Sequence, residues 1–338
     1  MNRWQSRPIE ERIGIINNVA FKTGISPNAI EKDWWVTMVL KALFETASKD
    51  FLTLKGGTSL GKMNLINRFS EDIDIAIDRS FFNMNGELTK KERTKLRKLS
   101  CAFIKNDLSV ELSERLKEMG IEGFMVIVPE STISDADPQE LYISYSSMFP
   151  EIEYIKSQVI IELSCRSMWD PFEKVNIQSI IAETYPDMEY CDDLFYIQIV
   201  SPKRTFLEKA FLLHEEFKLN RTKGSRMSRH LYDLEKLMDT EFAKHALSDT
   251  ELYVAIVKHR VAFNKWKDVN YREHHASTLN FIPPQKVAKE WENDYNYMRS
   301  LFIYEESLTY QQLIDRLNIL IERFRKIKLT DEFFNSSN

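Results

Sequence analysis

The sequence is poor in cysteine and glycine and lacks long apolar runs. It contains three cysteines and nine glycines in 338 residues. Because Cys101, Cys165 and Cys191 have no close spacing, they form no paired zinc or redox motif, and they favour a reducing compartment. The N-terminal residues lack the apolar core of a signal peptide, and no segment is apolar for long enough to cross a membrane. We therefore expect a cytoplasmic protein that does not contact the membrane.

The sequence also lacks an excess of positive charge. Its 46 Lys and Arg residues are outnumbered by 51 Asp and Glu residues, which gives a net charge of −5. Proteins that bind nucleic acid usually carry a basic surface, so contact with RNA would depend on local basic segments. Four segments are candidates, although each could equally be a solvated helix face: Lys90–Lys98, Lys218–Arg229, Lys258–Arg260 and Arg323–Lys328.

Two adjacent glycines, Gly56 and Gly57, follow a short apolar segment at 52–54. Glycine permits a tight turn from a strand into a helix and lets backbone N–H groups approach an anion closely. Thr58 and Ser59 come next and add hydroxyl groups. This pattern predicts a phosphate-binding turn made of these four residues.

Asp72 and Asp74 lie on either side of one apolar residue in a β-branched segment. Side chains alternate between the two faces of a strand, so both carboxylates should point to one face and Ile73 and Ile75 to the other. Two carboxylates on one face repel each other unless a cation lies between them. Their oxygen atoms favour Mg²⁺, which also binds phosphates. The turn and the two acids therefore predict a site for a nucleoside triphosphate and its magnesium.

Glu162 is a lone carboxylate in the apolar segment 159–164. A buried carboxylate is costly without a cation or a basic partner, so Glu162 is a candidate third acid of the same site. The alternative is a glutamate on the solvated face of an edge strand. Asp170 is the fallback for the third acid, although it precedes a proline and is typical of a turn.

The apolar patterns divide the chain into two parts. Helical spacing marks three early segments: 9–22 (with Ile13, Ile16, Val19 and Phe21), 27–47 and 88–119. Strand character marks five segments beyond the glycine turn and the acids: 124–128, 141–145, 159–163, 177–181 and 196–200. From Ser201 onward the pattern is helical. We therefore predict an α+β fold, with a mixed sheet and flanking helices in a domain at 1–200 and a mainly α-helical domain at 201–338.

Four motifs resemble those of the AbiEii/AbiGii-type nucleotidyltransferase toxins, which belong to the DNA polymerase β-like nucleotidyltransferase superfamily. They are GGTSL at 56–60, RFSEDIDI at 68–75, SPKRTFLEKAFLLHEEF at 201–217 and SRHLYDLEKL at 228–237. The resemblance extends from about Ile30 to Leu237 and does not include the C-terminal quarter. It implies a nucleotidyltransferase-like sheet and the toxin half of an abortive-infection or type IV toxin–antitoxin pair, with an antitoxin encoded nearby.

The resemblance also implies roles for the acids and for a lysine. The superfamily places a third acid on a strand beside the Asp-x-Asp strand, and Glu162 matches that position. Asp72, Asp74 and Glu162 would then hold two magnesium ions. Lys209 would hold the triphosphate of the nucleotide, with Arg204 as the competing choice.

The remaining motif residues would support this chemistry. Asp233 would face the site and either orient Lys209 or Arg229 or accept a hydrogen bond from the nucleotide. Arg229, as a nucleotide-binding residue, and His230 are further candidates in the same motif. Arg68 and Ser70 flank the acids and would orient them.

The helix that follows Ser26 offers two more candidates. Its EKDWWV segment also matches a family pattern, so Lys32 and Asp33 would either serve the site or belong to a helix that only supports the sheet.

The predicted reaction is attack of an acceptor hydroxyl on the α-phosphorus of a nucleoside triphosphate, with release of pyrophosphate. The resemblance implies that the acceptor is the 3′ end of a tRNA. The added nucleotide would block this end, so that translation stops. The acidic net charge favours a protein hydroxyl as the alternative acceptor. Two other classes stay open: a GTP- or ATP-binding module without transfer, against which the three acids count, and a nucleic-acid-binding regulator, for which the sequence shows no helix-turn-helix signature.

Overall fold

The computed structural model describes residues 2–130, 133, 135–150, 155–219, 226–264, 268–329 and 334. These residues divide into two units. The first unit comprises Met1–Met63 and Phe69–Val200, and the second comprises Asn64–Arg68 and Ser201–Asn338. The predicted domains at 1–200 and 201–338 differ from these units in the segment 64–68. That either part folds as an independent domain stays a prediction.

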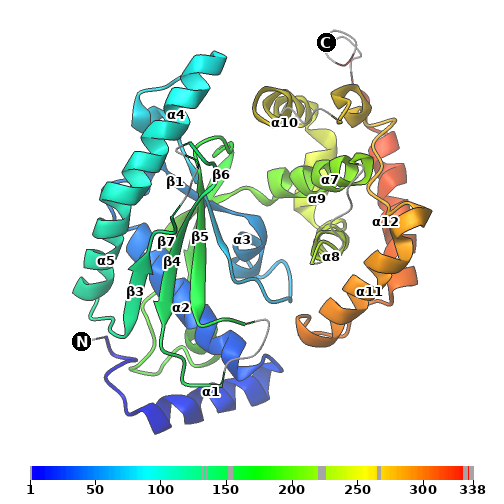
Figure 1. The fold of residues 1–338 in the computed structure, drawn as a ribbon. Coiled ribbons are helices and arrows are strands. Elements are labelled where there is room, and N and C mark those ends of the chain that lie inside the picture. Colours follow the sequence, from blue (N-terminus) through cyan, green and yellow to red (C-terminus); the bar gives the residue numbers. More distant parts are fainter. Residues whose placement is uncertain are drawn as a thin grey trace. The chain divides into compact units, whose positions relative to one another are not determined.

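A mixed sheet, seven-stranded in the described part of the chain, forms the centre of the first unit (Figure 1). Its strands are β1 (Leu52–Lys55), β2 (Ile73–Ile77), β3 (Phe124–Ile127), β4 (Gln139–Tyr145), β5 (Gln158–Ser164), β6 (Phe172–Ile177) and β7 (Phe195–Val200). They lie in the order β3-β4-β5-β2-β1-β7-β6, with β2 parallel to β5, β1 parallel to β7 and the other neighbours antiparallel. The predicted α+β class and mixed sheet are confirmed.

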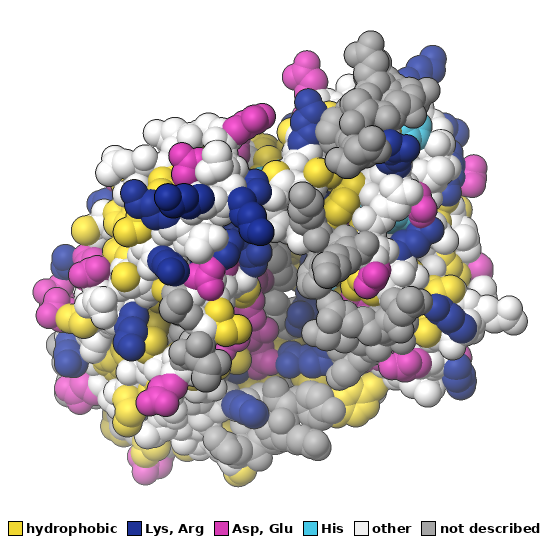
Figure 2. All heavy atoms as spheres, turned by 45° about the horizontal axis from the view of Figure 1, so that its top comes forward, with side chains coloured by type: hydrophobic (Ala, Val, Ile, Leu, Met, Phe, Trp, Pro, Cys, Tyr) yellow, Lys and Arg dark blue, Asp and Glu magenta, His cyan; other side chains and the backbone are white. Residues whose placement is uncertain are grey.

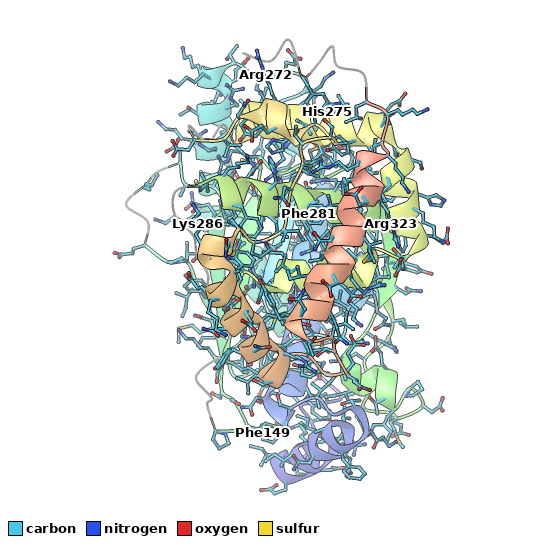
Figure 3. All side chains as sticks on the ribbon, turned by 90° about the vertical axis from the view of Figure 1, so that its right-hand side faces the viewer. Phe149, Arg272, His275, Phe281, Lys286 and Arg323 are labelled. Atoms are coloured by element: carbon cyan, nitrogen blue, oxygen red, sulfur yellow. The ribbon has the colours of Figure 1, made fainter. Side chains whose placement is uncertain are left out.

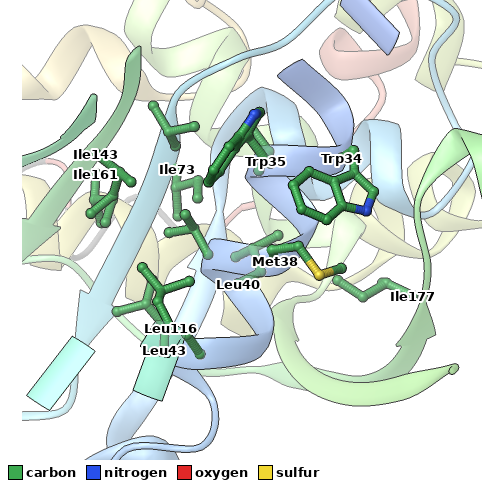
Figure 4. Close-up of a cluster of buried hydrophobic side chains, with 14 of the residues drawn as sticks. Trp34, Trp35, Met38, Leu40, Leu43, Ile73, Leu116, Ile143, Ile161 and Ile177 are labelled. Carbon is green, nitrogen blue, oxygen red and sulfur yellow. The ribbon is translucent and has the colours of Figure 1, made fainter. Parts of the chain in front are cut away.

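Helices flank this sheet. They are α1 (Ile9–Thr23), α2 (Pro27–Leu43), α3 (Gly56–Lys62), α4 (Lys90–Phe103), α5 (Ser109–Glu118) and α6 (Ile180–Thr184). Helix α2 is buried around most of its circumference, as its continuous apolar sequence predicts. Its Trp35 and Met38 pack in one cluster with Ile73 and Ile161 of the central strands (Figure 4). The sheet face that carries Ile73 and Ile161 is therefore the face covered by α2.

Two details of the predicted elements are wrong. The segment 177–181 is not a strand: Ile177 ends β6, and the Ser179 hydroxyl accepts a hydrogen bond from the Ala182 amide at 3.2 Å, which caps α6. Phe21 is 93% exposed and not part of the buried stripe of α1. It follows the buried Val19 by two positions, which on a helix places it on the opposite side.

The second unit is helical. It contains α7 (Pro202–Lys218), α8 (Arg229–Leu237), α9 (Glu241–Ser248), α10 (Thr250–Phe263), α11 (Gln285–Leu301) and α12 (Tyr310–Arg325). Figure 3 views this unit from the side of α11 and α12. Its core includes the buried Phe281, which packs against Phe324 of α12, which in turn stacks on Phe206 of α7. No helix in the described part of the chain is long and apolar enough to span a membrane.

We predict that Leu43→Ala lowers the free energy of unfolding by about 2–5 kcal/mol, because it leaves a cavity where a fully buried side chain packs against the sheet. Urea unfolding followed by tryptophan fluorescence measures this change. Phe21→Ala, at the exposed position of α1, is the control and should change the same quantity by less than about 0.5 kcal/mol. A similar loss for both variants would contradict the burial of Leu43 between α2 and the sheet.

Candidate active site

Four charged side chains form a row across the middle of the sheet. In the strand register, Lys55 of β1 lies opposite Asp74, Asp74 lies opposite Glu162 of β5, and Glu162 lies opposite Glu140 of β4. Residues directly opposite each other point to the same face. All four are half-buried, whereas their apolar neighbours point to the face covered by α2. Asp72 precedes Asp74 by two residues and shares this face.

Negative charge outweighs positive charge in this row. Lys55 Nζ lies 3.8 Å from Asp74 Oδ1, which is a long separation for an ion pair. Burial, followed by the charges of Asp74 and Asp72, raises the pKa of Glu162 to about 7, although Lys55 opposes the change. The alternative reading of Glu162 as an edge-strand residue is wrong, because β5 lies between β4 and β2. Glu140 adds to the same field and was missed in the sequence, where nothing distinguishes it from a surface glutamate.

The first glycine of the turn lies directly against the acids. Gly56 has a φ of +78°, a conformation that L side chains rarely adopt, and a Cβ at this position would lie 2.0 Å from Asp74 Oδ2. The backbone conformation favours glycine, and any side chain here would have to displace the Asp74 carboxylate. Helix α3 begins at Gly56, so the N-terminal end of this helix lies next to the Asp74 carboxylate.

The hydroxyl groups of the turn bind the chain itself. Thr58 donates to the backbone carbonyl of Asp72 at 2.6 Å, and its hydroxyl lies 3.1 Å from that of Ser70. Ser59 is fully buried and donates to the Gly56 carbonyl at 2.8 Å. In this structure Thr58, Ser59 and Ser70 therefore hold the turn against the start of β2.

A second charged cluster lies inside the second unit. Asp233 of α8 is fully buried and forms two hydrogen bonds with the Arg68 guanidinium, at 2.6 and 2.8 Å, and an ion pair with Lys209 of α7 at 2.7 Å. Burial opposes the charge of Asp233, but Arg68 and Lys209 outweigh it and hold the pKa of Asp233 well below its ordinary value. The structure thus pairs Asp233 with Lys209, one of the two partners proposed from the sequence, and adds Arg68, which the sequence did not suggest.

The cations of this cluster repel one another. Burial, together with the nearby charge of Arg68, lowers the pKa of Lys209, although the negative charge of Asp233 stabilises the protonated ammonium. Burial and the charges of Lys209 and Arg229 hold the pKa of His230 well below its ordinary value. His230 Nδ1 lies 3.3 Å from Lys209 Nζ. A lysine with a basic neighbourhood and one buried carboxylate suits the binding of a multiply charged anion.

The segment Asn64–Arg68 is held in the second unit by several contacts besides the Arg68 pair. The Asn67 side chain donates to Glu305 Oε2 at 2.8 Å, and Glu305 also accepts a hydrogen bond from the hydroxyl of Tyr232. The Tyr304 amide donates to the Asn67 carbonyl at 2.9 Å. Glu305 is a structural residue that no short motif in the sequence marks.

The structure gives two other candidates, Asp170 and Arg204, different surroundings. Asp170 lies just before the edge strand β6, which β2, β1 and β7 separate from the strand of Glu162. Arg204 is buried and pairs with Glu208 at 2.9 Å. Of the basic segment Lys218–Arg229, residues 220–225 lie outside the described residues.

The acids of the row suit a hard divalent cation, because carboxylate oxygens are the ligands that such an ion prefers and the acids of the row outnumber its single lysine. Among the residues that the structure describes, however, no three His, Cys, Asp or Glu side chains converge as a ready-made metal site. Metal binding by Asp72, Asp74 and Glu162 therefore stays a prediction that requires their side chains to reorient.

The match to one known protein family agrees with this chemistry. The model of a family described as a nucleotidyl transferase AbiEii toxin of a type IV toxin–antitoxin system matches residues 39–324. Two solved structures are similar at 15% identity and a TM-score of 0.42: a candidate nucleotidyltransferase from H. pylori, with 89% of this chain and 96% of that chain covered, and JHP933 from Helicobacter pylori, with 89% and 94% covered. No curated protein sequence matches the chain.

The family match includes β1, β2, β5 and helices α7 to α11 completely, and it defines a nucleotidyltransferase. The chain belongs to the AbiEii family of nucleotidyltransferase toxins from type IV toxin–antitoxin systems. A nucleoside triphosphate, a divalent metal and an antitoxin are the substrate, cofactor and partner that go with this family. The match reaches residue 324, so the C-terminal helices, which the sequence motifs left out, belong to the family pattern as well.

We predict that Gly56→Ala lowers transferase activity at least about 100-fold, because the new methyl group must displace the Asp74 carboxylate and occupy a strained conformation. The initial rate of pyrophosphate release measures this loss. Gly61→Ala in the same helix is the matched control: its methyl group would have no heavy atom within 4 Å, and activity should be retained. Equal activity of the two variants would contradict the close approach of Gly56 to Asp74.

We predict that Glu162→Gln raises the melting temperature of the metal-free protein at about pH 8 and that the gain shrinks toward about pH 5. The folded protein holds the Glu162 proton up to a pKa of about 7, against 4.5 ordinarily, so it binds more protons than the unfolded chain between these values. Stability therefore falls as the pH rises through this window, and the glutamine removes that loss. Thermal melting at several pH values tests this, with the exposed Glu114→Gln as control. A gain that does not depend on pH would show that it does not arise from the raised pKa of Glu162.

Proposed function

We propose that this protein is a magnesium-dependent toxin that transfers a nucleotide from a nucleoside triphosphate to the 3′ end of tRNA and so blocks translation. The observation that carries the proposal is the register of Asp74 and Glu162 on adjacent parallel strands, with Gly56 against the Asp74 carboxylate. Nucleotidyl transfer needs this combination of acidic oxygens and a close backbone approach, whereas binding alone does not require Glu162.

Asp72, Asp74 and Glu162 would hold the metal, as two Mg²⁺ ions. Bound magnesium supplies positive charge to the attacking hydroxyl and to the departing pyrophosphate. The half-buried Glu162, whose pKa burial and the neighbouring acids raise to about 7 in the metal-free protein, would also help to take the proton of the acceptor hydroxyl.

The protein's own cations and amides would position the nucleotide. The backbone amides of Gly57 and Thr58 at the start of α3 would donate to the phosphates, and Ser59 would support the turn through the Gly56 carbonyl. Lys209 would bind the triphosphate.

The buried ion pairs support that role for Lys209. Asp233 holds the Lys209 ammonium at 2.7 Å and orients it, while Arg68 and Arg229 add positive charge nearby.

The tRNA acceptor is supported by the family resemblance and by one basic element of the first unit. Helix α4 presents four exposed lysines: Lys90, Lys91, Lys95 and Lys98. Figure 2 turns the top of Figure 1 forward and shows several Lys and Arg side chains gathered on the part of the surface to which α4 belongs. Such a local basic surface can bind a phosphate backbone although the whole chain is acidic. Cytoplasmic location follows from the same proposal, because nucleoside triphosphates and tRNA are found there.

We predict that the purified protein, given Mg²⁺ and nucleoside triphosphates labelled at the α-phosphorus, transfers label to bulk tRNA. Asp74→Asn should reduce this transfer by at least about 1000-fold, because one carboxylate of the metal site is lost. Asp107→Asn, at an exposed acid of the first unit, should leave it unchanged. Expression of the active protein should arrest growth, and Asp74→Asn should relieve the arrest.

The acceptor can be read from the same experiment. Label on protein instead of tRNA would refute the tRNA proposal and favour the protein hydroxyl. Nucleotide binding without release of pyrophosphate would refute transfer altogether.

A further inference from the structure

Three consecutive charged residues, Glu31, Lys32 and Asp33, lie in the mostly apolar helix α2, and each binds a different part of the first unit. Lys32 is 2% exposed, and its ammonium lies 2.6 Å from Glu71 Oε2. Asp33 Oδ1 lies 2.6 Å from the ammonium of Lys62. These two ion pairs, Lys32–Glu71 and Asp33–Lys62, together form what we call the α2 clamp.

The partners of the clamp adjoin the two halves of the candidate site. Glu71 immediately precedes Asp72, and its side chain points to the face covered by α2 because it alternates with Asp72 along the chain. Lys62 is the last residue of α3, the short helix that begins at Gly56. One helix thus holds the start of the acidic strand with one residue and the end of the glycine-turn helix with the next.

Further hydrogen bonds fix both pairs in place. Lys32 also donates to the Lys156 carbonyl, just before β5, at 3.1 Å. Lys62 donates to the hydroxyl of Thr37, one turn along α2, at 2.8 Å. Asp33 Oδ2 accepts from the Ile180 amide at 2.8 Å. The two cations and the Asp33 carboxylate therefore have little freedom to move.

The clamp also lies where the chain leaves the first unit and returns to it. Residues 64–68 belong to the second unit, and in the sequence Lys62 lies before this segment and Glu71 after it. Any displacement of the segment that carries Arg68 would otherwise pass directly into α3 and into the strand that carries Asp72. The clamp lies where it can hold the glycine turn in a fixed position relative to Asp72 and Asp74, although residues 64–68 between them belong to the second unit.

Stability alone gives no reason for buried ion pairs at these positions. Removing one partner of such a pair leaves a buried charge and costs about 3–5 kcal/mol, but replacing both partners by neutral side chains is often neutral or stabilising. What an ion pair adds over an apolar contact is a fixed direction and distance between two segments.

We propose that Lys32, Asp33, Lys62 and Glu71 are positioning residues that fix the glycine turn relative to Asp72 and Asp74 and thereby set the affinity of the site for the metal–nucleotide complex. None of them need touch the substrate. The inference rests on the proposed function for its ligand, a divalent cation with a nucleoside triphosphate.

The test uses the double variant Lys32→Met/Glu71→Gln, which removes both charges of the pair together. Two quantities are measured on the full-length chain: the metal concentration at the midpoint of the Mg²⁺-induced rise in melting temperature, with and without a non-hydrolysable nucleoside triphosphate, and kcat and KM for transfer. We expect the metal-free melting temperature to stay near that of the wild type. The metal midpoint should rise, and kcat/KM should fall, by about 10- to 100-fold.

Two further variants separate positioning from mere folding. Glu31→Gln is the matched control, because Glu31 is equally buried on the same helix but binds Ser147 and Met148, after β4, and no part of the turn or the acidic strand. It should lower the melting temperature without moving the metal midpoint. Asp33→Asn/Lys62→Met tests the other half of the clamp and should move the midpoint in the same direction as the first double variant.

The outcomes distinguish this inference from the proposed function. A folded Lys32→Met/Glu71→Gln protein with the metal midpoint and kcat/KM of the wild type would overturn the clamp alone. An equal shift of the midpoint in Glu31→Gln would overturn it as well, because the effect would then belong to the helix as a whole. A wild-type protein whose melting temperature does not respond to Mg²⁺ and nucleotide would instead overturn the proposed function.

Discussion

The repulsion between Asp74 and Glu162, on neighbouring parallel strands, is the interaction on which the proposed chemistry of this protein depends. The register places the two carboxylates opposite each other, Asp72 and Glu140 extend the negative field, and Lys55 at 3.8 Å is too distant to neutralise it. A fold tolerates such a concentration of charge only at a cost in stability, and a bound divalent cation relieves that cost. The same strands carry the isoleucines of the main core on their other face, so the acids cannot move apart without disturbing the packing under α2.

The second unit carries the opposite imbalance. Among the ion pairs of the described residues, Asp233 is the carboxylate that binds both Arg68 and Lys209, and Arg229 adds further positive charge near Lys209. One cluster therefore favours cations and the other favours anions. By charge alone, the first cluster suits a metal ion and the second suits a phosphate group.

The sequence predicted the elements whose pattern is local and missed what depends on contacts between distant segments. The alternation of Ile73, Asp74 and Ile75 predicted a strand with acids on one face, and burial confirms the apolar face. The positive φ of Gly56 fits the predicted turn, but its contact with Asp74 depends on the pairing of β1 with β2. Glu140 and Glu305 were missed because only strand register and tertiary packing give them partners. Phe21 was wrongly assigned to the buried face of α1 because it is hydrophobic and lies only two residues after the buried Val19.

The segment 64–68 shows why motif order alone cannot give the arrangement of this protein. In the sequence, Arg68 stands four residues before Asp72 and is naturally assigned to the acids. In the structure its guanidinium binds Asp233, 165 residues further along the chain, and its segment is part of the helical unit. A buried guanidinium requires a carboxylate with matching geometry, and Asp233 provides it. The chain between the glycine turn and the acids is thus fixed at its middle by the second unit and at its ends by α2. Both motifs of the candidate nucleotide site are consequently tied to residues that no local pattern connects with them.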